Sequence, residues 1–128
     1  MRLEPHHLGI DVSDLDTSLA FYEKLGFERL RVFSAEGGLS IAFMRLGALQ
    51  LELFAYDRPL PARASGRCLG LRHLALSTDD IERDMRDLKA AGLVREDAET
   101  RDLPNGMRLL FFPDPDGTEI EILQQPAS

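Results

Sequence analysis

The sequence has a single cysteine, no long apolar run and too few basic residues to balance its acidic ones. With Cys68 alone no internal disulfide can form, and the N-terminal segment lacks the pattern of a secretion signal, so we expect a cytoplasmic protein. No apolar stretch approaches the roughly 20 residues that span a membrane, which predicts a soluble chain. The formal net charge of -7 disfavours nucleic acid and anionic membranes as partners.

What remains is typical of a globular protein. The length of 128 residues and the 44% of hydrophobic residues predict a single domain over 1–128 with its own core. Cys68 lies in the segment RASGRCLGLRH without an evident base, so it is interpreted as a packing residue rather than a nucleophile.

The chain contains an internal repeat. The segment from His7 to Phe27 aligns without a gap on the segment from His73 to Leu93. Identical pairs in this alignment are His7 with His73, Leu8 with Leu74, Asp14 with Asp80, and Gly26 with Gly92. Each copy predicts a short strand, a turn, a helix of about three turns and a glycine stop.

Apolar residues recur in each predicted helix at spacings of three and four, which indicates one buried face per helix. Asp14 (or Ser13) and Asp80 (or Asp79) are the expected N-terminal caps. The expected stripes are Leu15, Leu19, Tyr22 and Leu25 in the first helix, and Ile81, Met85, Leu88 and Ala91 in the second.

After each helix comes sequence that divides into about three strands at glycines and at Asn105-Gly106. The sequence therefore predicts an α+β fold of two tandem βαβββ modules, about 4–60 and 70–125, joined by a linker at 57–69. A single module would bury too little surface to form a stable core alone. We therefore expect the curved sheets of the two modules to form a shared metal-binding cavity.

Strand alternation predicts which side chains face that cavity, because successive residues point to opposite faces. The apolar residues next to them pack beneath the helix, which leaves four polar side chains on the other face: His7, Glu52, His73 and Glu121. Taken singly, each is better interpreted as a solvated or half-exposed surface residue. The repetition of one His and one Glu in each module favours a common function.

A glutamate inside an apolar strand costs free energy unless it is paired or bound to metal. Two imidazoles and two carboxylates suit one divalent ion such as Zn, Ni, Co, Mn or Fe, with positions left open for water or substrate. The four residues are therefore predicted to be metal ligands.

The sequence resembles the vicinal oxygen chelate superfamily, also called glyoxalase/bleomycin resistance protein/extradiol dioxygenase. The resemblance covers nearly the whole chain and rests on several short motifs. These are HLGI at His7 to Ile10, SDL at Ser13 to Leu15, LGF at Leu25 to Phe27, LEL at Leu51 to Leu53, GLRHLA at Gly70 to Ala75, and FPDPDG at Phe112 to Gly117 before Ile120-Glu121-Ile122.

The resemblance implies the same metal set and places His6 as a surface neighbour. It also implies a homodimer in which a second chain covers an open edge or cavity mouth. A set of four ligands is similar to the sets of glyoxalase I and methylmalonyl-CoA epimerase, whose reactions pass through metal-bound enolates. The resemblance therefore implies that Glu121 or Glu52 acts as the catalytic base.

Glutathione is a disfavoured substrate. Similar glutathione-using members carry Arg four residues after the first His and Asn four after the first Glu, where this chain has Asp11 and Tyr56. Four arginines are candidates for binding some other anionic group of a substrate, although most of them are expected to lie on the surface. The candidates are Arg45, Arg72, Arg101 and Arg108.

Three functions stay open. The first is a metal-dependent isomerase, epimerase or lyase acting on a small carbonyl or thioester substrate. The second is a non-haem Fe(II) or Mn(II) dioxygenase or resistance enzyme that uses His7, His73 and Glu121. The third is a ligand-binding protein of the same fold without turnover.

Overall fold

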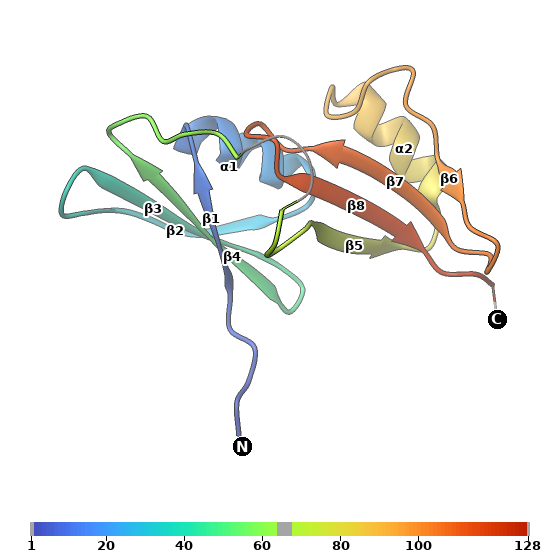
Figure 1. Cartoon of the computed structure of the whole chain (residues 1–128), viewed down its shortest axis with the longest axis horizontal. Helices are drawn as coiled ribbons and strands as arrows, with labels where there is room; N and C mark the ends of the chain where they lie inside the picture. The colour runs from blue at the N-terminus through green and yellow to red at the C-terminus, as the bar shows by residue number, and fades with distance from the viewer. Residues whose placement is uncertain (1, 64–67, 128) are drawn as a thin grey trace. The chain divides into compact units, whose positions relative to one another are not determined.

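The computed structural model describes residues 2–63 and 68–127, and the chain divides into two compact units, Met1–Ala62 and Arg63–Ser128 (Figure 1). The predicted linker at 57–69 spans the boundary between the units, and its residues 64–67 lie outside the described residues. Neither of the two described helices has the length and apolar character needed to cross a membrane.

The first unit is a βαβββ module, as predicted. Its elements are β1 (Leu8–Val12), α1 (Leu15–Lys24), β2 (Glu28–Ala35), β3 (Leu39–Leu46) and β4 (Leu49–Tyr56). The strands form one sheet in the order β1-β4-β3-β2, in which β1 runs parallel to β4 and the other neighbours are antiparallel. The first and last strands of the module are therefore neighbours.

The second unit repeats this topology and confirms the α+β prediction of two tandem modules. Its elements are β5 (Leu74–Thr78), α2 (Ile81–Ala90), β6 (Arg101–Asp102), β7 (Arg108–Pro113) and β8 (Glu119–Gln124). The sheet order is β5-β8-β7-β6, with β5 parallel to β8. The main difference is the outer strand, because β6 has only two residues whereas β2 has eight.

Helix α1 begins and ends where the sequence predicts. Asp14 is the N-cap and accepts hydrogen bonds from the hydroxyl and the backbone N–H of Thr17, which lower the pKa of its carboxyl. Leu19 and Tyr22 are buried on the sheet side. Gly26 follows the helix with φ 108°, a backbone conformation that favours glycine. The helix is thus fixed at both ends and along its apolar face.

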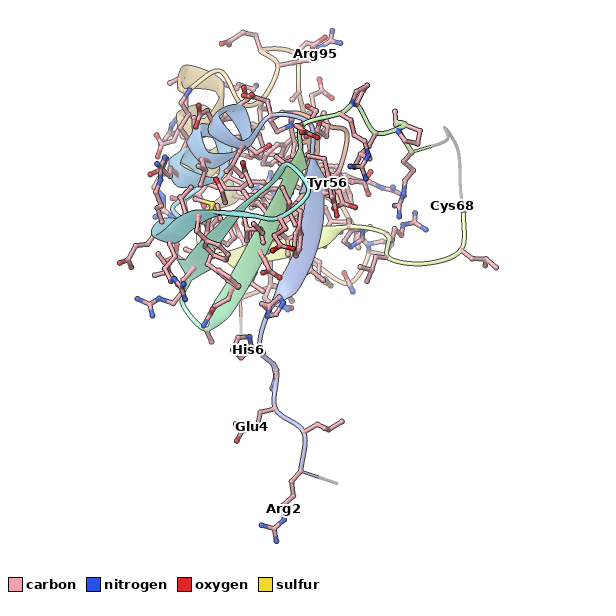
Figure 2. All side chains as sticks on the ribbon, turned by 90° about the vertical axis from the view of Figure 1, so that its left-hand side faces the viewer. Arg2, Glu4, His6, Tyr56, Cys68 and Arg95 are labelled. Atoms are coloured by element: carbon pink, nitrogen blue, oxygen red, sulfur yellow. The ribbon has the colours of Figure 1, made fainter. Side chains whose placement is uncertain are left out.

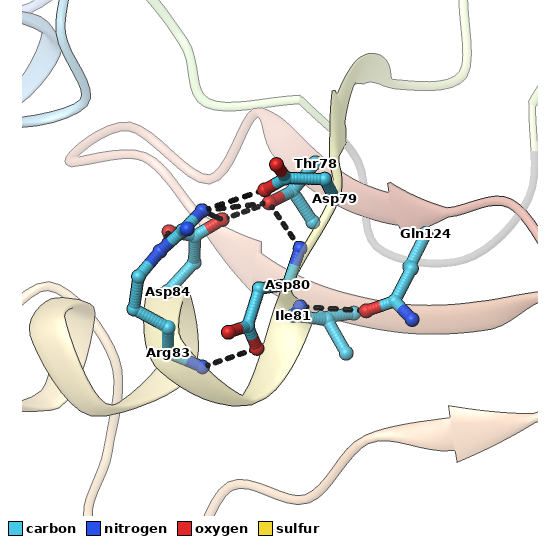
Figure 3. Close-up of polar contacts among 7 residues, drawn as sticks. All are labelled: Thr78, Asp79, Asp80, Ile81, Arg83, Asp84 and Gln124. Carbon is cyan, nitrogen blue, oxygen red and sulfur yellow. Dashed lines mark hydrogen bonds and ion pairs between the residues drawn. The ribbon is translucent and has the colours of Figure 1, made fainter.

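The start of α2 is tied to β8 as well as to its own cap (Figure 3). The carboxylate of Asp80 accepts a hydrogen bond from the backbone N–H of Arg83 at 3.1 Å. The side-chain oxygen of Gln124 on β8 accepts one from the backbone N–H of Ile81 at 2.7 Å. The Thr78 hydroxyl accepts from the backbone N–H of Asp80 at 3.1 Å. These bonds satisfy N–H groups that the first turn of a helix leaves free.

One residue of the predicted helical stripes is misplaced. Ile81 and Leu88 are buried, but Ala91 is exposed, because α2 ends at Ala90 and Ala91 is its C-cap. The stripe predicted from spacing therefore extends one residue too far.

A tight turn between β7 and β8 is built around the buried carboxylate of Asp114. Its Oδ1 accepts hydrogen bonds from the backbone N–H groups of Asp116 and Thr118, each at 2.9 Å. The backbone N–H of Asp114 donates to the carbonyl of Thr118 at 2.8 Å. Because β8 starts at Glu119, this turn sets the register in which the following residues pair.

We expect Asp114→Ala to lower the free energy of unfolding by about 1 to 3 kcal/mol, because two backbone donors lose their acceptor. Urea titration followed by circular dichroism measures the change. Asp114→Asn is the matched control, since its amide oxygen can still accept both bonds and most of the stability should remain. Equal unfolding midpoints for wild type and Asp114→Ala would show that the turn does not depend on this carboxylate.

Candidate functional site

In the first unit, His7 and Glu52 meet on one face of the sheet. Glu52 lies on β4 directly opposite Gly9 of the parallel strand β1, and His7 precedes the first residue of β1 by one position. The Nε2 atom of His7 lies 3.1 Å from Oε1 of Glu52. The Glu52 side chain is only 15% exposed, so its charge requires a partner.

The second unit holds His73 and Glu121 in the same arrangement. Glu121 lies on β8 directly opposite Ala75 of the parallel strand β5, and His73 immediately precedes β5. The Nε2 atom of His73 lies 3.4 Å from Oε2 of Glu121, whose side chain is 12% exposed. Each unit therefore brings together the His and the Glu that strand alternation assigns to one face.

Each pair also includes a phenylalanine that the sequence analysis missed. Phe43 pairs with Glu52 across β3 and β4, and Phe111 pairs with Glu121 across β7 and β8. The edge of the His7 ring meets Phe43 at a centroid distance of 5.7 Å, and His73 meets Phe111 at 5.8 Å. Extending the gapless repeat would not have found them, because it aligns Phe43 with Leu109 rather than with Phe111.

The second ring nitrogens of the histidines have different neighbours. Nδ1 of His7 is hydrogen-bonded to Nδ1 of His6 at 2.7 Å, and Figure 2 shows His6 on the segment that precedes β1. Nδ1 of His73 lies 3.5 Å from Oε1 of Glu119, but within the described parts of the chain it makes no hydrogen bond. In both units the Nε2 atom is the one that approaches the largely buried glutamate, Glu52 or Glu121.

The donor chemistry of both pairs fits a divalent ion. Two ligand atoms that each lie about 2.1 Å from one ion stand roughly 3.0 to 3.4 Å apart at the usual coordination angles. The two Nε2–oxygen distances fall in this range. Over residues 2–63 and 68–127 no group of three or more His, Cys, Asp or Glu side chains is close enough to hold a metal ion. The ion that unites the four residues stays a prediction.

Other candidates from the sequence lie elsewhere. Cys68 is exposed, so its interpretation as a packing residue is wrong: it lies in the coil before β5, where nothing covers it among the described residues (Figure 2). Asp11 is exposed on β1. Tyr56 ends β4, with the Arg58 guanidinium 4.8 Å from its ring centroid.

Two of the four candidate arginines are already paired. Arg45 contacts Glu28 at 3.3 Å. Arg108 contacts Asp102 at 2.9 Å and Glu82 at 2.5 Å, and hydrogen bonds to these carboxylates raise its pKa. Arg72 and Arg101 are exposed, as surface arginines were expected to be.

Comparisons with known proteins agree with this architecture. The family model of the Glyoxalase/Bleomycin resistance protein/Dioxygenase superfamily matches residues 4–122. The uncharacterized protein YwkD of Bacillus subtilis (strain 168) is 32% identical over 123 residues, covering 94% of this chain and 95% of the relative. The uncharacterized protein YaeR of Escherichia coli (strain K12) is 33% identical over 131 residues, covering 94% and 95%.

Solved structures give the same result. A glyoxalase family protein from Enterococcus faecalis has a TM-score of 0.83 and 38% identity, covering 94% of this chain and 96% of that one. A glyoxalase I mutant from Zea mays has a TM-score of 0.76 at 24% identity and covers 94% of this chain but 45% of that longer one, which shows a common fold. With its two βαβββ modules and a family match over almost its whole length, the chain belongs to the glyoxalase/bleomycin resistance protein/dioxygenase superfamily.

Proposed function

We propose that this protein is a metal-dependent enzyme of the glyoxalase/epimerase type, an isomerase or lyase that moves a proton next to the carbonyl of a small ketone, aldehyde or thioester. The observation that carries the proposal is the repeated contact between a histidine Nε2 and a largely buried glutamate, His7 with Glu52 and His73 with Glu121. A surface role for four separate residues does not account for this repetition.

The four side chains would hold one divalent ion, such as Zn, Ni, Co, Mn or Fe, with both pairs drawn from one chain or from the two chains of a homodimer. When bound, such an ion acts as a Lewis acid that polarises a substrate carbonyl and makes the neighbouring C–H bond more acidic. Nε2 of each histidine is the donor atom available on that face.

The glutamates have a second task in this proposal. Glu121 contacts His73 through Oε2, and Glu52 contacts His7 through Oε1. These contacts each use one oxygen of the carboxylate, and the second oxygen of the same group can accept a proton. Glu121, the more buried of the two, is the proposed base, and Glu52 is the alternative.

Solvent isotope exchange distinguishes this reaction from the other two functions. Metal-loaded protein is incubated in D₂O with a panel of methyl ketones and acyl thioesters, while NMR follows the C–H signals and an electrode follows dissolved oxygen. We expect deuterium to enter at the carbon next to the carbonyl without oxygen uptake, and the metal-free protein to be inactive.

Two results contradict the proposal. Oxygen consumption coupled to product formation, without isotope exchange, supports a dioxygenase that uses His7, His73 and Glu121. Compounds that bind equally well with and without metal, and that exchange no proton, support a binding protein without turnover.

A further inference from the structure

The sheet face that carries His7 and Glu52 also carries an arginine that the sequence analysis did not select. Arg31 on β2 lies directly opposite Phe43 on β3, and Phe43 lies directly opposite Glu52 on β4. Residues that pair directly across neighbouring strands point to the same face. Arg31 and Glu52 are therefore members of one row, separated by two strand spacings, or roughly 10 Å between their backbones.

Aromatic rings fill the space between them. The guanidinium carbon of Arg31 lies 5.1 Å from the centroid of the Phe33 ring. Phe33 stacks on Phe43 at a centroid distance of 6.3 Å with 18° between the planes, and Phe43 meets the edge of His7. Both phenylalanines are half-buried, so part of each ring is accessible. A continuous aromatic wall thus leads from the His7–Glu52 pair to Arg31.

The charge of Arg31 is not neutralised. Across residues 2–63 and 68–127 it contacts no carboxylate, and its interaction is the stacking on Phe33. Its neighbours on this sheet differ, since Arg29 pairs with Glu23 at 2.8 Å and Arg45 pairs with Glu28 at 3.3 Å. In a chain of net charge -7, an exposed guanidinium without an acidic partner is available for an anion from outside.

We infer that Arg31 determines specificity by binding the carboxylate of a substrate whose carbonyl reacts beside Glu52. A guanidinium offers a planar fork of donors that matches a carboxylate, and stacking on Phe33 limits its orientations. The substrate would carry a flat or apolar spacer between carbonyl and carboxylate, packed on Phe43 and Phe33. The claim that the carbonyl reacts beside Glu52 rests on the proposed function, whereas the claim that Arg31 binds a carboxylate does not.

Among its described residues, the second unit has no equivalent of Arg31. Its outer strand β6 consists of Arg101 and Asp102, which pair with Leu109 and Arg108. The row of Phe111 and Glu121 therefore receives no residue from β6. The anion-binding position is built by the first module alone.

Two small probes test the inference. 4-Acetylbenzoate has a ketone and a carboxylate on opposite sides of one aromatic ring, and 4-acetylbenzamide has the same shape without the charge. Binding of each to the full chain is measured by NMR titration, with zinc and after metal removal, and the Nε–H resonance of Arg31 is followed. The wild type should bind the benzoate roughly tenfold more tightly than the benzamide, with the Arg31 resonance shifting.

The variants Arg31→Gln and Arg45→Gln provide the contrast. Arg31→Gln should abolish the preference for the benzoate, whereas Arg45→Gln, which removes a paired arginine from the same sheet, should keep it. The inference is overturned if the wild type binds both probes equally or binds neither, or if both variants lose the preference to the same extent. Because the metal-free protein is also titrated, a preference that persists there supports the anion position even if the proposed function fails.

Discussion

His73→Ala should lower the metal content of the purified protein at least tenfold while leaving the fold intact. The side chain is partly exposed, so its removal costs little packing, but Nε2 is one of only two imidazole donors in the proposed set. Elemental analysis after dialysis against the chosen metal gives the stoichiometry, and circular dichroism reports the fold.

His6→Ala is the matched control, because His6 is exposed and contacts His7 through Nδ1, away from the His7–Glu52 contact. It should retain most of the metal. Equal stoichiometry in wild type and His73→Ala means that His73 is not a ligand, and the metal set would then have to be abandoned.

Glu121→Gln should slow proton exchange in D₂O by roughly 100-fold or more. The amide keeps the shape of the side chain and one neutral oxygen for the ion, but it cannot accept a proton. NMR measures the exchange rate on whichever probe the wild type turns over, and metal occupancy is determined in the same samples so that the rate is compared at equal loading.

Glu119→Gln serves as the comparison for this change. Glu119 is a more exposed carboxylate that approaches the other nitrogen of His73, so its loss should have a much smaller effect on the rate. An unchanged rate in Glu121→Gln at full occupancy would move the role of base to Glu52.

The His and Glu positions were predictable because the strands that carry them are regular. In β4, buried leucines alternate with less buried residues, so Glu52 is assigned to a face by counting in twos from Leu51 or Leu53. In β8, Glu121 lies between two buried isoleucines in the same way, although the exposed fraction of Glu121 itself is small. Alternation within one strand needs no knowledge of its neighbours.

Arg31 could not be assigned in this way. The pairing of β2 with β3 shifts between Arg29 and Arg31, and such an irregularity changes which residues of a strand share a face. Nothing in the sequence around Arg31 marks that shift. Phe43 and Phe111 were not predicted for a related reason. Their positions beside the histidines depend on the register between strands rather than on the pattern within one strand.

The short strand β6 has a consequence for how the two halves tolerate mutation. In the first module, the row across β4, β3 and β2 is proposed to serve both the ion and the ligand, so a substitution of Arg31 or a change in the pairing shift of β2 would alter which compounds are accepted. In the second module the row ends at Phe111, and β6 is exposed at both residues. Changes at β6 that keep the ion pair between Asp102 and Arg108 should therefore be nearly neutral, which makes this edge the better place to attach a label or to build a new binding surface.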